Sequence, residues 1–169
     1  MSYLVDRYAN TLVIKAKEIL NDETIPRSLT VNAFYNALKY DLENYNWKNQ
    51  NILQDSSFFG RTLAHNGKNT VAVNQFDSLI PFLPLFNITI ILVANIKVRQ
   101  ERLLKRIENS PELVTQDDLL VIDNPEKFLE NEKILIYHMQ RVFDGHIIDT
   151  SSTSTQKTAD IILKKVNNL

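Results

Sequence analysis

The sequence contains no cysteine and only three glycines among its 169 residues. The absence of cysteine excludes disulfides, cysteine-ligated zinc or iron–sulfur sites, and thiol nucleophiles. Average glycine usage of about 7% gives roughly 12 glycines in a chain of this length. Gly60, Gly67 and Gly145 do not have the close, fixed spacing of a dinucleotide-binding fingerprint or an ordinary phosphate-binding loop. This scarcity limits the nucleotide-binding motifs that the sequence can contain.

Neither sign of charge is in excess, and long uninterrupted apolar runs are also missing. The net charge is −1 and the pI is about 6.3, so we expect no general attraction to nucleic acid. The first residues include Asp6 and Arg7 and do not resemble a signal peptide. The most apolar stretch, 79–96, is interrupted by Pro81 and Pro84, which favours a loop and a buried strand over a membrane span. We therefore expect a cytoplasmic protein that does not act at a membrane.

The length suits a single domain, residues 1–169, whose first part, 1–67, is predicted to be mainly helical. Apolar side chains recur at helical spacing over 4–20 and over 31–45, with Thr30 as the candidate N-cap of the second helix. A third helix is expected from about residue 55 to residue 67.

The pattern changes after residue 67, where short β-rich runs alternate with helices. Strands are expected at 70–73, 88–94 and 146–149. Helices are expected at 98–107, from Pro125 to Phe143, and after a capping box formed by Thr153 and Gln156. Because the run 88–94 is apolar throughout, it favours a parallel strand covered by helices on both faces. The predicted fold class is α/β, with a short parallel sheet flanked by helices in 68–169 and a helical N-terminal portion.

Polar residues follow all three predicted strands. Ligands of parallel α/β sheets bind beyond the carboxyl ends of the strands, where such residues meet. The residues concerned are Asn74, Gln75 and Asp77, then Asn95, and finally Asp149, Thr150 and Ser151. The sequence therefore predicts a ligand site at this edge of the sheet.

Three arginines lie in the helix predicted after the second strand. Arg99, Arg102 and Arg106 are spaced i, i+3 and i+7, so one helix face presents all of them. Guanidinium groups bind phosphate oxygens bidentately, which favours a phosphorylated ligand. However, the next segment, 108–132, holds eight acidic residues and one lysine. The alternative is thus a solvated basic face that pairs with this acidic segment.

Three stretches in the last 105 or so residues are similar to a known family. They are LAHNGKNTVAVNQFD (63–77), ITIILVANIKVRQERLLKR (88–106) and DGHIIDTSSTSTQKTADIILKKV (144–166). They resemble parts of the P-loop nucleoside monophosphate kinases. The first stretch resembles a helix and the strand after it, the second the strand and helix that lead into the lid, and the third the last strand, its loop and the closing helix. The cytidylate kinase-like branch is the most similar.

The resemblance implies roles for residues at two places. Arg102 and Arg106 face the nucleotide and assist phosphoryl transfer from ATP. Asp77 holds Mg²⁺ or a substrate hydroxyl, unless it only caps a turn. The loop 149–152, with Thr150, Ser151 and Ser152, would line the cofactor's adenine end mostly through its backbone, and Arg99 would join the other two arginines on the helix face toward the nucleotide. The implied ligands are therefore a nucleotide and, in an active enzyme, ATP and Mg²⁺.

The sequence departs from the family at the phosphate loop, whose backbone N–H groups and lysine position the phosphates. Six residues separate Gly60 from Gly67, whereas the loop has four, and Gly67-Lys68 ends a predicted helix instead of starting one. Asn74, Gln75 and Phe76 also stand where the cytidylate-type enzymes have a Gly-Arg-Asp clamp on the monophosphate. Phosphate transfer is therefore left open by the sequence.

Two functions follow. The first is a divergent nucleoside or nucleotide kinase, or at least a kinase-like nucleotide binder. The alternative is a catalytically inactive kinase-like subunit that acts through a protein partner, which includes a second copy of the chain. The arginines favour the first function, and the missing phosphate loop favours the second.

Overall fold

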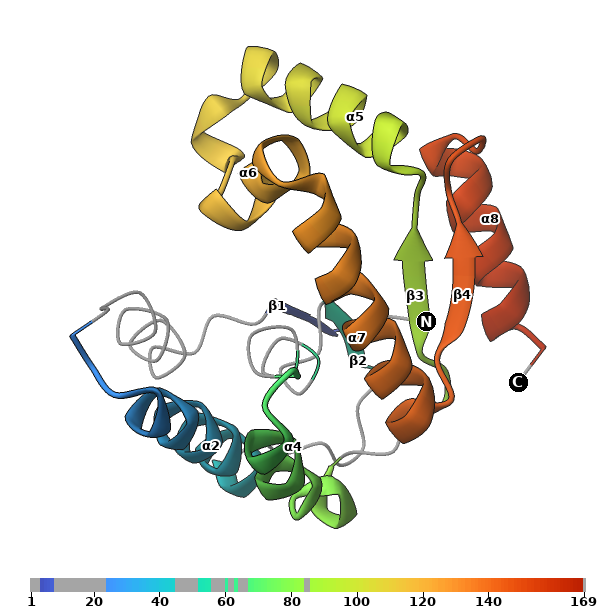
Figure 1. Ribbon diagram of the computed structural model, residues 1–169. Helices are drawn as coiled ribbons and strands as arrows, with labels where there is room; N and C mark the ends of the chain where they lie inside the picture. Colours follow the sequence, from blue (N-terminus) through green and yellow to red (C-terminus); the bar gives the residue numbers. More distant parts are fainter. Residues whose placement is uncertain are drawn as a thin grey trace. The chain divides into compact units, whose positions relative to one another are not determined.

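In the computed structural model the chain forms two compact units, Met1–Leu85 and Phe86–Leu169. Each unit is described by itself (Figure 1). The structure describes residues 4–7, 24–44, 52–55, 60, 63, 67–83 and 86–168. Among these residues, no helix has the length and apolar character needed to cross a bilayer.

The first unit contains a pair of parallel strands and two described α-helices. Strand β1 (Leu4–Arg7) pairs with β2 (Ile52–Asp55), with Leu4 opposite Ile52. Helix α2 (Arg27–Asn44) packs against α4 (Thr70–Asp77), and a 3-10 helix follows at Ile80–Phe82. Phe34, Leu38, Leu63 and Phe76 are fully buried, so they form the core of the described part of this unit.

Two sequence predictions for the first unit are wrong. Residues 4–7, expected in a helix over 4–20, form β1, and the rest of that predicted helix, 8–20, lies outside the described residues. Residues 70–73, expected to be a strand, form the first turns of α4. The Asn69 side chain accepts hydrogen bonds from the Val71 and Ala72 amides at 3.1 and 3.2 Å, which starts this helix.

The helix predicted at 31–45 is confirmed, although α2 begins before the expected cap Thr30, at Arg27. The helix expected from about residue 55 begins later, because Asp55 is the last residue of β2. Gly60 and Leu63 are helical as predicted. The helical N-terminal portion is therefore corrected to a mixture of strands and helices.

The second unit is an α/β arrangement around two parallel strands. Strand β3 (Ile90–Val93) pairs with β4 (His146–Asp149), in a register that puts Val93 opposite Asp149. The remaining elements are α5 (Ile96–Asn109), a 3-10 helix (Pro111–Leu113), α6 (Gln116–Asp123), α7 (Pro125–Phe143) and α8 (Thr155–Val166). Figure 1 shows the strand pair between α7 and α8. The predicted fold class is therefore confirmed at the level of α/β with parallel strands.

Side-chain caps explain where these helices begin. Asn95 caps α5, Thr115 and Asp118 form a capping box on α6, and Asn124 caps α7 just before Pro125. Ser154 caps α8 by accepting from the Lys157 amide at 3.2 Å, so the predicted box of Thr153 and Gln156 is misplaced by one residue. The predictions of β3, α5, α7 and β4 are confirmed, and the bounds of α7 and β4 match those expected.

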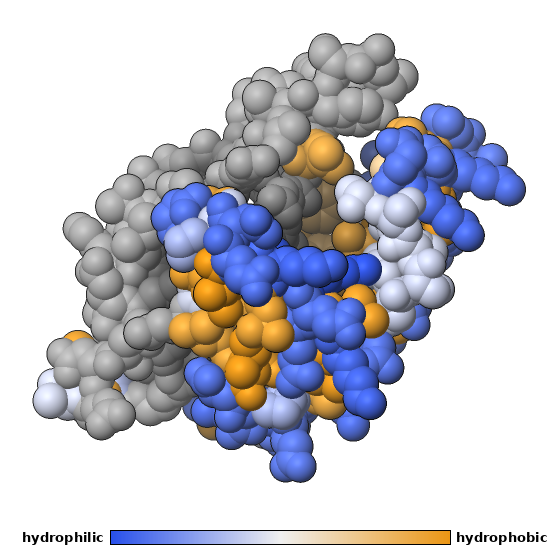
Figure 2. All heavy atoms as spheres, turned by 90° about the horizontal axis from the view of Figure 1, so that it is seen from above, coloured by the Kyte–Doolittle hydropathy of each residue, from blue (hydrophilic) through white to orange (hydrophobic). Residues whose placement is uncertain are grey.

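The core of the second unit is small, and several large apolar side chains remain exposed. Leu103, Val121, Met139 and Ile148 are buried. The exposed ones include Leu92, Leu104, Leu113, Tyr137, Ile147 and Leu163. Figure 2 shows an apolar area bordered by hydrophilic residues on the face that it displays.

Candidate functional site

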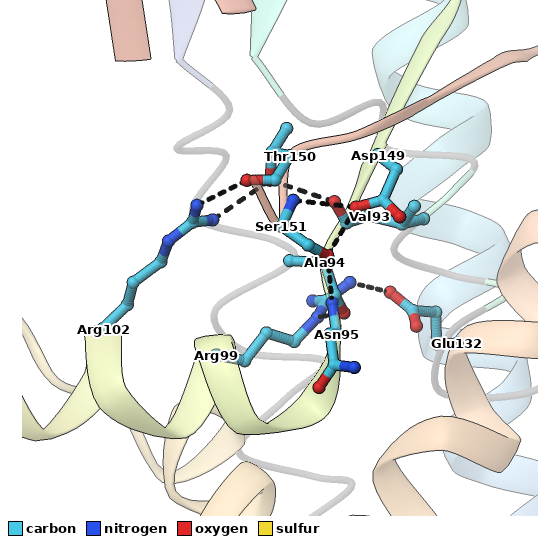
Figure 3. A network of polar contacts seen from close by, with 9 residues as sticks. All are labelled: Val93, Ala94, Asn95, Arg99, Arg102, Glu132, Asp149, Thr150 and Ser151. Atoms are coloured by element: carbon cyan, nitrogen blue, oxygen red, sulfur yellow. Dashed lines mark hydrogen bonds and ion pairs between the residues drawn. The ribbon is translucent and has the colours of Figure 1, made fainter. Parts of the chain in front are cut away.

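The carboxyl ends of β3 and β4 bring together two groups of polar residues that the sequence places more than fifty positions apart. The Thr150 amide donates to the Val93 carbonyl at 2.8 Å, which continues the strand ladder by one residue. Asn95, Asp149 and Ser151 lie beside this bond (Figure 3). The prediction that residues after these two strands meet is therefore confirmed. Residues 74–77, expected to follow a third strand, belong to helix α4 (Thr70–Asp77) of the first unit.

Arg102 reaches from α5 to Thr150 with two hydrogen bonds. Its Nη1 donates to Thr150 Oγ1 at 3.0 Å and its Nη2 donates to the Thr150 carbonyl at 2.7 Å. Thr150 is 8% exposed, and its hydroxyl donates in turn to the Val93 carbonyl at 3.0 Å. Because two bonds fix the orientation of a planar group, the Arg102 guanidinium is held at a set angle while the residue itself remains exposed.

Asp149, Ser151 and Asn95 form a second chain of hydrogen bonds. The Ser151 amide and hydroxyl both donate to Asp149 Oδ1, at 2.8 and 2.5 Å. The Asn95 amide donates to Ser151 Oγ at 2.7 Å, which joins the end of β3 to the loop after β4. The hydrogen bond from the Ser151 hydroxyl is the main cause that lowers the pKa of Asp149. These bonds hold Asp149 and Ser151 together in the loop after β4.

Arg99 is used within the fold. Its Nε donates to the Ala94 carbonyl at 2.8 Å and its Nη2 forms an ion pair with Glu132 of α7. The guanidinium carbon lies 5.0 Å from the centre of the Phe128 ring, within the range of a cation–π contact. The Arg99 and Glu132 side chains are only 21% and 18% exposed. Arg99 therefore joins the end of β3 to α7, close to the loop that Arg102 holds (Figure 3).

The other predicted site residues have different surroundings. Arg106 pairs with Asp118 of α6 at 3.5 Å, and both side chains are substantially exposed. Ser152 is exposed in the turn between β4 and α8. Asp77 is the last residue of α4, so the expectation that it follows a strand is wrong. Among the described residues, no three His, Asp or Glu side chains gather to hold a metal ion, and the role of Asp77 toward Mg²⁺ stays a prediction.

The three arginines of the basic helix face have different partners. Arg99 and Arg106 pair with the acidic segment, as the solvated-face alternative predicts. Arg102 instead bonds to Thr150 at the strand ends, and its contact with a ligand stays a prediction. Sequence reasoning missed Glu132 and Phe128 as individual partners. Their i, i+4 spacing on α7 places them on one helix face, which was the available signal.

The arrangement offers a fixed planar cation, hydroxyl groups and backbone groups at an exposed sheet edge. These groups suit binding of a planar or phosphorylated molecule. Comparison of the chain with family models, curated proteins and solved structures gave no match.

Proposed function

We propose that the chain binds a nucleotide at the carboxyl edge of β3 and β4, next to Arg102 and residues 150–152. The observation that most supports this proposal is the state of Arg102. The residue is exposed to solvent, and two hydrogen bonds to Thr150 fix the orientation of its guanidinium. A guanidinium plane stacks on nucleobases and its remaining N–H groups bind phosphate oxygens. Because the group is already oriented, a ligand does not have to offset the entropy of ordering it.

The proposal extends the resemblance to nucleotide kinases, but it concerns binding first. A kinase reaction in the cytoplasm would use ATP and Mg²⁺, with Arg102, Arg106 and Asp77 as the catalytic groups that the sequence predicts. Phosphoryl transfer depends on close positioning of the phosphates. The 169 residues include three widely spaced glycines and no segment with the spacing of a phosphate loop. Binding is therefore the part of the predicted activity that the described geometry supports best.

Calorimetry with ATP, ADP and a panel of nucleoside monophosphates tests the proposal. We expect saturable binding of at least one nucleotide, and roughly tenfold or greater weakening in Arg102→Met, which keeps the aliphatic volume but removes the guanidinium. Lys105→Met is the matched control, since it removes one positive charge from another exposed position of α5. Absence of heat with every nucleotide would refute the function. Binding that Arg102→Met leaves unchanged would reject the site.

Arg106→Ala tests whether Arg106 contacts the phosphates of the ligand. If Arg106 contacts the phosphates, the variant binds di- and triphosphates more weakly and monophosphates nearly as well, because the lost contact involves the terminal phosphates. Equal affinity of the variant and the wild type for all of them would remove Arg106 from the site. A coupled assay for ADP release from ATP, with each monophosphate as acceptor, tests phosphate transfer directly.

A second candidate function is a subunit that acts through a protein partner. It is favoured by the exposure of Leu92 and Ile147, at 51% and 47%, because parallel strands are usually covered on both faces. Gel filtration with light scattering tests for a homo-oligomer. A stable monomer over a wide concentration range would argue against self-association, and unchanged solubility in Leu92→Ser and Ile147→Ser would argue against a masked apolar contact.

A further inference from the structure

We infer that Arg99 is a positioning residue for the proposed nucleotide site: it joins the end of β3 to α7 and thereby sets where α5 presents Arg102, without touching the ligand itself. This inference rests on the proposed function. It differs from the role that the sequence suggested for Arg99, which was direct contact with the nucleotide.

The contacts of Arg99 occupy its guanidinium on several sides. The Nε bond to the Ala94 carbonyl, at 2.8 Å, closes the turn between β3 and α5. The ion pair with Glu132 and the contact with the Phe128 ring connect the same group to α7. The hydrogen bond and the ion pair involve Nε and Nη2, and the Arg99 and Glu132 side chains are only 21% and 18% exposed. A phosphate that drew the guanidinium away from α7 would leave the largely buried Glu132 carboxylate without its cation, which is unfavourable.

The position of Arg99 on α5 explains how it acts on Arg102. The two residues are three apart, so they project from adjacent turns of one helix face. Asn95 caps the same first turn through its side chain, at 2.9 Å from the Lys97 amide, and its own amide donates to Ser151 Oγ. The first turn of α5 is thus fixed to β3, to α7 and to the loop after β4. Arg99 provides the attachment to α7 and a bond to the Ala94 carbonyl at the end of β3, so its loss allows α5 to tilt relative to Thr150.

The neighbouring pair of Arg106 and Asp118 provides an internal contrast. Their side chains are 49% and 33% exposed and lie 3.5 Å apart, whereas those of Arg99 and Glu132 are 21% and 18% exposed. Exposed ion pairs of this kind contribute little to stability. Arg99 therefore differs from Arg106 in the number and burial of its contacts, which supports a structural task for Arg99 alone.

Glu132→Gln distinguishes positioning from direct contact by the sign of its effect. If Arg99 only positions Arg102, Glu132→Gln weakens nucleotide binding, because the connection to α7 is loosened. If Arg99 binds phosphate, Glu132→Gln tightens binding, because it removes a competing carboxylate and a negative charge. We expect roughly 3- to 30-fold weaker binding in both Arg99→Met and Glu132→Gln. The double variant should bind no more weakly than the worse single variant, because both changes break one connection.

Ligand dependence gives a second criterion. The loss caused by Arg99→Met should be similar for mono-, di- and triphosphates, and similar at low and high salt, since no phosphate contact is removed. Lys97→Met, which removes an exposed charge from the same turn of α5, serves as the control and should change affinity less than twofold. Tighter binding in Glu132→Gln, or a loss that grows with phosphate number, would overturn the inference.

A measurement on the ligand-free protein tests whether Arg99 positions Arg102, separately from whether a nucleotide binds. Nitrogen-15 relaxation of the arginine Nε–H signals reports how rigidly each guanidinium is held, and Arg102→Lys assigns the Arg102 signal. We expect the Arg102 order parameter to fall in Arg99→Met and in Glu132→Gln, and to stay unchanged in Lys97→Met. An Arg102 signal as rigid in Arg99→Met as in the wild type would refute positioning by Arg99, whatever the calorimetry shows.

Discussion

Substitution of Thr150 by valine removes the hydroxyl that connects Arg102 to β3 while keeping the shape of the side chain. The hydroxyl accepts from Arg102 Nη1 and donates to the Val93 carbonyl, each at 3.0 Å. Neither partner is left without a bond, because Arg102 keeps the Thr150 carbonyl and the Val93 carbonyl keeps the Thr150 amide. The expected cost is therefore that of two lost hydrogen bonds, one of them charge-assisted, or roughly 2 kcal/mol of unfolding free energy.

Thr150→Ser is the matched comparison. It keeps the hydroxyl and removes one methyl group from a buried side chain, which should cost about 1 kcal/mol. The valine variant is therefore expected to be less stable than the serine variant, although valine is closer to threonine in volume and more apolar. Packing alone predicts the opposite order, so the ranking of the two variants separates the two explanations.

Urea unfolding followed by far-ultraviolet circular dichroism measures both changes. The single tryptophan, Trp47, belongs to residues 1–85, so its fluorescence is unsuited to following the second unit. In an Arg102→Met background the cost of Thr150→Val should fall by about 1 kcal/mol, because one of its two bonds is already absent. An equal cost in both backgrounds, or a valine variant more stable than the serine variant, would refute the bonding scheme drawn from the structure.

Three further changes test the connection between α7 and β4 and the loop that follows. Gly145→Ala should destabilise the protein by about 1 to 3 kcal/mol, since an added Cβ lies 2.7 Å from Ile91 Cδ1, and Ile91→Val should recover part of the loss in thermal unfolding. Asp144 has a φ of 50°, so Asp144→Gly should raise the unfolding free energy by up to about 1 kcal/mol in urea titrations; a lower value would contradict the argument from backbone strain. The Ser151 hydrogen bond lowers the pKa of Asp149, so its stabilisation is complete above the ordinary carboxyl pKa and is lost as the pH falls below about 4. The stability difference between wild type and Asp149→Asn should accordingly shrink between pH 6 and pH 3, and a constant difference would exclude this bond as its source.

The second unit could be predicted well from the sequence because its local signals agree with one another. An uninterrupted apolar run predicts β3, Pro125 opens α7 after Asn124, and the run 146–149 forms β4. In each case composition, caps and neighbouring turns favour the same element. The parallel pairing followed from the same run, since apolar residues on both faces are typical of a covered parallel strand.

The first unit was predicted poorly because its signals compete. Val71 and Val73 are β-branched, but the Asn69 side chain caps two amides and starts α4 instead. Strands β1 and β2 lack an uninterrupted apolar run, because β1 ends in Asp6 and Arg7 and β2 ends in Gln54 and Asp55. Without such a run to indicate the strands, the pairing of residues almost fifty positions apart could not be predicted.

For the candidate site, too, the sequence indicated the residues within one element but not the contacts between elements. The sequence identified Arg99, Arg102 and Arg106 as one helix face, and the strand-end rule identified Thr150 and Ser151. It did not show which arginine meets which partner, because the partners belong to α6, α7 and the loop after β4. Those elements lie next to α5 only once the unit is folded.

Helix geometry explains why three arginines on one face have three different surroundings. An α-helix rises about 1.5 Å per residue, so Arg106 lies about 10 Å farther along α5 than Arg99. Over that length α5 leaves the strand ends and passes α6, where Asp118 is available. Arg99 lies in the first turn, where the Ala94 carbonyl and α7 are within reach. Arg102 lies between them, where the loop after β4 is the neighbour. A shared helix face therefore establishes a common direction but not a common role, and the residue whose guanidinium is fixed and still exposed is the one to test first for a ligand.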